Sequence, residues 1–111
     1  ILPQGTTQQR AVPLRNVEGV RLFVYPYGDI EVISAKADKG RAIRQAAKQL
    51  GMDPARILGI GDSINDLPMF EGCGLRVAMA NATDQVKAQA DYITLSNEED
   101  GVGEALRRLV L

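Results

Sequence analysis

Residues 57–70 read Ile-Leu-Gly-Ile-Gly-Asp-Ser-Ile-Asn-Asp-Leu-Pro-Met-Phe, and no other segment of the chain is as informative. The apolar run at 57–60 predicts a short buried strand, and Asp62 follows where that strand would end. In open α/β sheets, ligands bind at the carboxyl ends of the strands. Gly61 lets the backbone turn tightly without a Cβ clash, and the oxygen atoms of residues 63–66 suit a hard cation such as Mg²⁺. The segment therefore predicts a strand that places a carboxylate at a ligand-binding edge.

Asp66 has two roles that fit its position. It precedes Leu67-Pro68, and aspartate is a favoured N-cap where proline occupies the first helical turn. The neighbouring Asn65 can likewise form a simple Asx turn. In the other interpretation both side chains face a bound cation. Asp62 is different, because it directly follows an apolar run and lies too far from the predicted helix to cap it.

The composition fits one globular domain with a modest core, since 45% of the 111 residues are hydrophobic and 24% are charged. Thirteen basic and fourteen acidic residues give a net charge of −1, which does not indicate a surface for nucleic acid or for membranes. The sequence has no apolar run long enough for a transmembrane helix and no secretory signal. We therefore expect a cytoplasmic protein without nucleic-acid or membrane partners.

The residue types that are missing narrow the chemistry. These 111 residues contain no histidine, which excludes Ser-His catalysis, Cys-His catalysis and histidine zinc sites within them. Their one cysteine, Cys73, cannot form an internal disulfide and is expected to be a small core residue in a reducing compartment. Any chemistry must rest on carboxylates, lysine, hydroxyls and amides.

The first third of the chain predicts little regular structure apart from a hairpin. Residues 1–19 mix Pro, Gly, Gln and Thr without clear periodicity, and we expect a flexible lead or an edge segment there. Two runs with alternating apolar residues follow at 20–25 and 30–34, joined by Pro26-Tyr27-Gly28-Asp29. A linker of this composition between two such runs predicts a β-hairpin.

From Lys39 onward, short apolar strands alternate with helices. Helical spacing of apolar residues or a capping residue predicts the helices, and Gly51 marks the expected end of the first one. The predicted helices cover 39–50, 67–71, 84–90 with Asp84 as cap, and 102–110, and the predicted strands cover 57–60, 75–79 and 92–95. This order implies parallel strands joined by right-handed crossovers. The predicted fold class is α/β, as part of a doubly wound parallel sheet that carries an N-terminal β-hairpin.

Lys39 begins the first of these helices at a place that helix physics does not favour. A lysine at a helix N-terminus opposes the helix dipole, and Gly40 costs about 1 kcal/mol relative to alanine in a helix interior and less at an end. Two unfavourable local choices side by side often mark a functional place, although an exposed lysine on a solvated face is an equally good explanation. Together, Lys39 and Asp62 supply the cation and the Mg²⁺ carboxylate that phosphoryl transfer needs.

These residues also resemble a known family. Lys39-Gly40, followed by residues 60–70, looks like motifs III and IV of the haloacid-dehalogenase-like (HAD) superfamily, and more narrowly of its Cof-type sugar-phosphatase branch. The likeness covers residues 29–110 and continues through further segments, namely 74–82, 86–87, 90–94 and 97–102. A HAD resemblance implies a Rossmann-like parallel sheet.

The resemblance also implies roles for individual residues. Lys39 would bind the substrate phosphate and the nucleophilic carboxylate, and Asp62 would coordinate Mg²⁺. Asn65 and Asp66 match the Asn-Asp pair that supports the metal and phosphate site, which makes Asp66 an expected second metal ligand and catalytic residue. Asn81 matches a loop that lies near the site in relatives, and is expected to contact the substrate phosphate.

One motif of the family is missing from this sequence. Family members begin with an apolar strand ending in Asp-x-Asp-Gly, whose first aspartate is the nucleophile, and a cap domain is inserted later. No Asp-x-Asp occurs here, and Asp29-Ile30-Glu31 follows a Pro/Gly turn, so Asp29 is expected to be a turn residue. The resemblance therefore implies a C-terminal portion: a lead or cap remnant at 1–19, the end of the cap at 20–36, and half of the HAD core at 37–111.

The expected function is that of a Mg²⁺-dependent phosphomonoester hydrolase acting on sugar phosphates or similar small phosphorylated metabolites, with this segment alone inactive. Unpaired sheet edges in a half-domain also favour self-association. The alternative is a non-catalytic HAD-like binding or regulatory module that kept the scaffold without the nucleophile. A receiver-like phospho-acceptor domain fits less well, because its acidic cluster precedes its lysine, whereas Asp62 follows Lys39.

Overall fold

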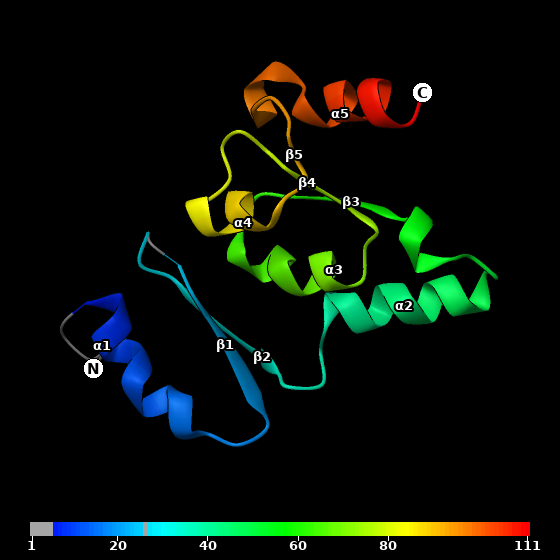
Figure 1. Ribbon diagram of the computed structural model, residues 1–111. Coiled ribbons are helices and arrows are strands. Elements are labelled where there is room, and N and C mark those ends of the chain that lie inside the picture. The colour runs from blue at the N-terminus through cyan, green and yellow to red at the C-terminus, as the bar shows by residue number, and fades with distance from the viewer. Residues whose placement is uncertain (1–5, 26) are drawn as a thin grey trace. The chain divides into compact units, whose positions relative to one another are not determined.

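The computed structural model describes residues 6–25 and 27–111, without the side chains of Thr7 and Gln8. The chain divides into two compact units, residues 1–37 and 38–111, whose elements are labelled in Figure 1. Among the described residues, no helix has both the length and the apolar character needed to cross a membrane. Each unit is described by itself.

The first unit contains the predicted hairpin. Strand β1 (Val20–Val24) pairs antiparallel with β2 (Ile30–Ser34), with Val20 opposite Ser34 and Val24 opposite Ile30. In the connection, the Tyr25 N–H donates to the Asp29 carbonyl at 2.9 Å. The hairpin prediction is confirmed, with the first strand one residue shorter than expected. Asp29 lies in the turn, as predicted.

Residues 1–19 were expected to form a flexible lead or an edge segment, but residues 7–16 are helical. They form α1 (Thr7–Ala11) and the 3₁₀ turn η1 (Val12–Asn16). Thr6 and Gln9 form a capping box: the Thr6 hydroxyl accepts from the Gln9 N–H at 3.1 Å, and the Gln9 side chain accepts from the Thr6 N–H at 2.9 Å. The Thr-x-x-Gln spacing is the sequence signal for this helix start. Residues 1–5 lie outside the described residues.

The second unit is the predicted α/β assembly. Its parallel sheet has the order β3-β4-β5 and is built from short strands, namely β3 (Leu58–Gly61), β4 (Leu75–Ala78) and β5 (Tyr92–Ile93). Its helices are α2 (Lys39–Gln49), α3 (Leu67–Glu71), α4 (Asp84–Gln89) and α5 (Gly101–Leu109), and its 3₁₀ turns are η2 (Pro54–Arg56), η3 (Ile64–Asp66) and η4 (Asn97–Glu99). Each predicted element is present, and its ends differ from the prediction by two residues at most.

The ends of the helices show one confirmed prediction and one error. Gly51 adopts φ +66° after α2, and the Met52 N–H donates to the Ala47 carbonyl at 2.8 Å, as in a Schellman C-cap. The prediction for α4 is wrong by one residue, because Thr83 and not Asp84 is its N-cap. The Thr83 hydroxyl accepts from the Val86 N–H, and Asp84 is the first helical residue, where the helix dipole favours its charge.

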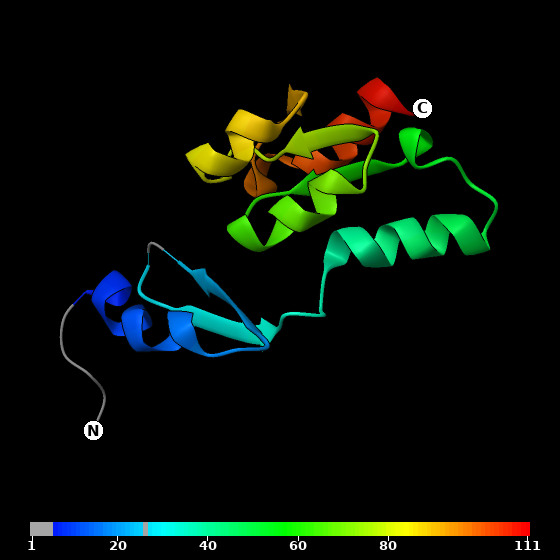
Figure 2. The same cartoon turned by 60° about the horizontal axis from the view of Figure 1, so that its bottom comes forward.

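The sheet is covered on both faces. On one face, buried residues of β4, α3, α4 and the loop between β4 and α4 form the core cluster Phe70, Ala78, Met79, Ala82 and Val86. Helix α5 lies on the opposite side of the sheet from α3, as Figures 1 and 2 show, and its Ala105 is fully buried. Val77 is also fully buried, and its side chain points away from the face of Ala78 because side chains alternate along a strand.

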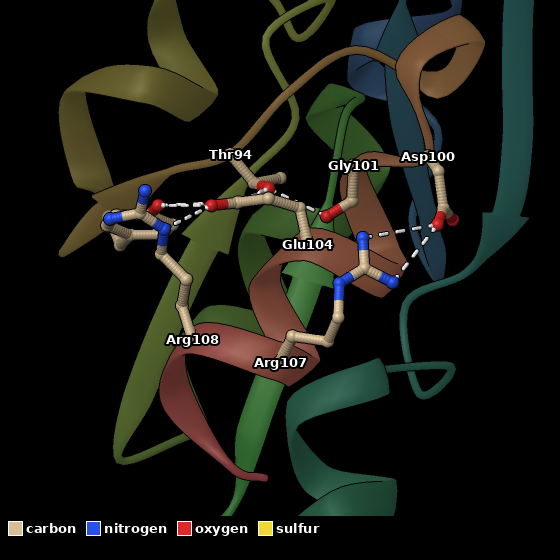
Figure 3. A network of polar contacts seen from close by, with 7 residues as sticks. Thr94, Asp100, Gly101, Glu104, Arg107 and Arg108 are labelled. Atoms are coloured by element: carbon tan, nitrogen blue, oxygen red, sulfur yellow. Dashed lines mark hydrogen bonds and ion pairs between the residues drawn. The ribbon is translucent and has the colours of Figure 1, made fainter.

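A polar network fastens α5 to the strand before it (Figure 3). Thr94 is buried, and its hydroxyl lies 2.6 Å from the Gly101 carbonyl oxygen and 2.5 Å from Glu104 Oε2. The Tyr92 hydroxyl donates to Glu104 Oε1 at 3.0 Å, and Arg108 Nε lies 2.7 Å from the same oxygen. Glu104 therefore receives hydrogen bonds from β5, from the segment after it and from its own helix.

We expect Thr94→Val to destabilise the protein by about 1–3 kcal/mol, because the buried hydroxyl, whose one proton lies between the Gly101 carbonyl and the Glu104 carboxylate, is lost. Urea unfolding at neutral pH measures this change. Thr94→Ser is the matched control, since it keeps the hydroxyl and should lose clearly less stability. A larger loss for Thr94→Ser than for Thr94→Val would mean that the methyl group, and not the hydroxyl, supports α5.

The network also predicts a pH dependence. The Thr94 hydroxyl, followed by Tyr92 and two arginines, holds the pKa of Glu104 below its ordinary value. A carboxyl whose pKa is lowered by folding stabilises the fold above its unfolded pKa, about 4.3 for glutamate, and this contribution is lost as the pH falls through the folded-state pKa. Wild type should therefore be more stable than Glu104→Gln at pH 7, with a smaller difference at pH 3. Urea unfolding of both proteins at the two pH values would contradict this if the difference were constant.

Candidate functional site

The loops that follow the three parallel strands are tied together at one edge of the sheet. After β3, the Asp62 carbonyl accepts from the Thr83 N–H at 3.2 Å in the loop that follows β4. In that same loop, Asn81 Oδ1 accepts from the Asn97 N–H at 3.0 Å in the segment that follows β5. The carboxyl edge therefore holds Asp62 and Asn81 in connected loops, as the strand order predicts.

Lys39 and Asp66 meet at this edge, although they are 27 positions apart in the sequence. Lys39 Nζ, at the first turn of α2, lies 2.9 Å from Asp66 Oδ1. The other oxygen, Asp66 Oδ2, accepts from the Asp62 N–H at 3.0 Å and from the Ser63 N–H at 3.2 Å. The side chain of Lys39 is 52% exposed and that of Asp66 only 14%, so the carboxylate is the enclosed partner and the ammonium remains open to solvent.

The interpretation of Asp66 as the cap of the following helix is wrong. Asp66 stands at the N-cap position of α3, but its side chain makes no capping hydrogen bond to that helix. It belongs instead to a capping box one turn earlier, in which its carboxylate accepts from the Ser63 N–H. The carboxylate therefore points back toward the end of β3 and away from α3.

Glycines allow the close approaches on which the pair depends. A Cβ on Gly61 would lie 2.7 Å from Asp66 Cβ and 3.0 Å from its Oδ2. A Cβ on Gly40 would run into the Pro68 carbonyl, and one on Gly72 would lie 2.8 Å from the Gly40 carbonyl oxygen. The first turn of α2 thus packs with its backbone against α3. Gly40 is explained by this packing, not by a direct part in the chemistry.

Asp62 and Asn65 lie at the same edge, and their side chains contact no polar partner in the part of the chain that the structure describes. Asp62 is exposed, and among the described residues no hydrogen bond or ion pair engages its carboxylate or the Asn65 amide. The described part of the chain holds no group of three or more acidic, cysteine or histidine side chains that could bind a metal ion. Mg²⁺ commonly takes one or two protein carboxylates and completes its shell with water and substrate phosphate. The Asp62 carboxylate therefore fits as one ligand of such a site.

Cys73 is not part of this edge. Its sulfur packs where a Cβ on Gly59 would lie, within β3. Burial raises the pKa of the Cys73 thiol above its ordinary value, which disfavours the nucleophilic thiolate. The residue fits the predicted role of a small packing side chain.

Gly40→Ala tests the packing that brings Lys39 to Asp66. Alanine is intrinsically the better helix former, yet here we expect a loss of about 1–3 kcal/mol, because the added methyl meets backbone that cannot move aside cheaply. The matched control is Gly103→Ala in α5, where the three atoms nearest to the new methyl all belong to the Asp100 side chain, which can move aside. Urea unfolding should show Gly103→Ala as neutral or stabilising, and a stabilising Gly40→Ala would contradict the proposed close contact.

A family profile described as haloacid dehalogenase-like hydrolase matches residues 10–106. The chain belongs to this HAD family. The match includes both units, so it covers the β-hairpin as well as the parallel sheet. It confirms the resemblance that motifs III and IV indicated.

Individual relatives agree with this assignment. The chain is 45% identical over 83 residues to the 5-amino-6-(5-phospho-D-ribitylamino)uracil phosphatase YcsE of Bacillus subtilis, which covers 75% of the chain and 33% of that protein. It is 37% identical over 110 residues to a phosphoglycolate phosphatase of Methanopyrus kandleri, covering 91% of the chain and 47% of that protein. Among solved structures, the HAD subclass IIB sugar phosphatase BT4131 matches with a TM-score of 0.81 and 25% identity, covering 93% of the chain and 40% of that structure. The chain thus spans a third to a half of these relatives' length.

The HAD residues expected from the sequence fall into two groups. Lys39, Asp62 and Asp66 come together through the ion pair and the Asp62 backbone N–H. Asn65 lies in η3 between the two aspartates, and Asn81 is engaged with Asn97. The sequence placed Ser63 and Gly61 at this turn but did not show how they serve Asp66: the Ser63 N–H binds its carboxylate, and Gly61 leaves room for it. The Ser-x-x-Asp spacing was the available signal for the first.

Proposed function

We propose that this chain is the metal- and lysine-bearing part of a Mg²⁺-dependent phosphomonoester hydrolase that acts on sugar phosphates or similar small phosphorylated metabolites. The observation that carries the proposal is the Lys39–Asp66 pair beside the unengaged carboxylate of Asp62, at the carboxyl edge of a parallel sheet. A partly exposed ammonium next to a free carboxylate suits a phosphate group and the metal ion that accompanies it.

Each residue has a distinct part in this proposal. Lys39 binds and neutralises the phosphate oxygens, where an ammonium stabilises charge that builds up during transfer. Asp62 is a ligand of Mg²⁺, which, when bound, polarises the phosphoryl group. Asn65 is a phosphate donor from η3. Asn81 donates through Nδ2, because its Oδ1 already accepts from the Asn97 N–H.

The nucleophile is assigned to polypeptide outside these 111 residues. The sequence contains no Asp-x-Asp, and the relatives are two to three times as long as the matched region. In this proposal residues 20–36 are the end of a cap domain and residues 37–111 are part of the HAD core. The unpaired edge of β3, at the end of the order β3-β4-β5, is then a surface for association with a further strand.

The names of the relatives support the substrate class. They describe phosphatases for a phosphoribityl compound, for phosphoglycolate and for sugar phosphates. These substrates share a phosphate monoester on a small polar carbon skeleton. The shared chemistry is what the proposed edge recognises.

A chimera tests the proposal directly. The 83 matching residues of Bacillus subtilis YcsE would be replaced by the corresponding residues of this chain. We expect Mg²⁺-dependent release of inorganic phosphate, reduced by about 100-fold or more by Lys39→Met or Asp62→Asn, as when a transition-state charge partner is removed. Lys48→Met and Asp84→Asn are matched controls on exposed surfaces of α2 and α4 and should keep the activity.

The chimera, and not the chain alone, separates the enzyme from the non-catalytic alternative. By itself it should not hydrolyse phosphate esters with Mg²⁺, because it lacks the nucleophile in both cases. A folded chimera without activity, with its controls equally inactive, would favour a binding or regulatory module. Robust Mg²⁺-dependent turnover by the isolated 111 residues would contradict the assignment of the nucleophile to another segment.

A further inference from the structure

The geometry points to Asp66 as a positioning residue that holds the Lys39 ammonium against the turn formed by Asp62 and Ser63, and not as a ligand of the metal ion. This inference rests on the proposed function, in which Lys39 binds phosphate and Asp62 binds Mg²⁺. It assigns Asp66 a role other than the metal ligation expected from the family resemblance.

The first argument is that the Asp66 carboxylate has little coordinating capacity left. A carboxylate offers about four lone-pair sites on its two oxygens. Oδ1 accepts from the Lys39 ammonium at 2.9 Å, and Oδ2 accepts from two backbone N–H groups at 3.0 and 3.2 Å. Three sites are therefore occupied by protein donors. A metal ion would compete for the remaining site on Oδ1, beside a positive charge.

The second argument is electrostatic. A divalent cation on Oδ1 would lie close to the Lys39 ammonium, and the two positive charges would repel each other. Asp62 has no such conflict, since its carboxylate is exposed and unengaged among the described residues. The two aspartates thus have different roles. The Asp62 carboxylate is open to a metal ion, and the Asp66 carboxylate is already paired with the Lys39 ammonium.

The third argument is that the surroundings of Asp66 fix its side chain. Only 14% of the side chain is exposed. It packs against the backbone at Gly61, where a Cβ would come within 2.7 Å of Asp66 Cβ. Because two backbone amides also bind this enclosed carboxylate, it offers the Lys39 ammonium an acceptor at a fixed position.

The consequence is a fixed relation between the phosphate-binding and the metal-binding groups. Lys39 comes from the start of α2 and Asp62 from the end of β3, and Asp66 contacts both of them. Without Asp66, the long lysine side chain would sample many rotamers, which costs binding free energy when it is ordered by substrate.

Nuclear magnetic resonance on the full 111-residue chain tests the inference. In wild type the Lys39 Nζ signal should be observable at neutral pH, because ion pairing slows exchange of its protons, whereas the Lys48 signal should not be. In Asp66→Asn the Lys39 signal should disappear, and amide exchange at Asp62 and Ser63 should accelerate about tenfold, the change expected from losing a charge-assisted hydrogen bond. Asp62→Asn, as matched control, should keep the Lys39 signal. An Asp66→Asn protein with unchanged Lys39 and amide signals would overturn the inference.

A Mg²⁺ titration of wild type separates positioning from ligation without any variant. We expect Mg²⁺ to shift the signals around the Asp62 carboxylate while the Lys39 Nζ signal and the slow exchange of the Ser63 amide persist. If Mg²⁺ abolished both of these features, Asp66 would be a metal ligand and the inference would be wrong. If Mg²⁺ changed nothing at Asp62, the proposed metal site would fail, and the Asp66→Asn comparison would still decide the positioning role.

Discussion

The Asp66 carboxylate makes the hydrogen bonds on which this edge of the sheet depends. Oδ2 gathers the two backbone amides of the turn after β3, and Oδ1 receives the ammonium from α2. The contact is available because Gly61 leaves no Cβ in the way. A strand end, a turn and a helix start are therefore fixed by one side chain. Their distances are set by hydrogen-bond geometry and not by the length of the intervening chain.

Backbone packing makes this contact reachable. Lys39 can meet a residue 27 positions away only if α2 lies close to the start of α3. Gly40 and Gly72 let the two backbones approach at distances that side chains would forbid, with Pro68 supplying a carbonyl at the contact. Gly40, beside Lys39, thus permits the close backbone packing that brings the lysine to the site. Its helix penalty is offset by the packing that it permits, so an unfavourable local propensity follows from a tertiary requirement.

The strands and most helices were predictable from the sequence, because the spacing of apolar residues and the capping residues depend on local structure. The same rules located Asp62 at the edge and Gly51 at the end of α2. These rules failed where the role of a residue depended on contacts distant in sequence, or where two helix starts could use the same capping residue. Asp66 fits a cap for α3 equally well in the sequence, and only the fold shows that its carboxylate turns back to Ser63. The helical stretch at residues 7–16 was missed because a polar lead without apolar periodicity outweighed the short capping-box signal at Thr6.

Asp62 shows how such an edge keeps a reactive group available. Its backbone is fully used: the N–H donates to Asp66, and the carbonyl accepts from Thr83. Its side chain is exposed and engaged by none of the described residues. The main chain therefore fixes the position while the carboxylate keeps its lone pairs for an incoming cation, and its exposure avoids the desolvation cost of a buried charge. A second free carboxylate would need the same support. Asp66 uses three of its lone-pair sites for that support, through the hydrogen bonds from Lys39, Asp62 and Ser63.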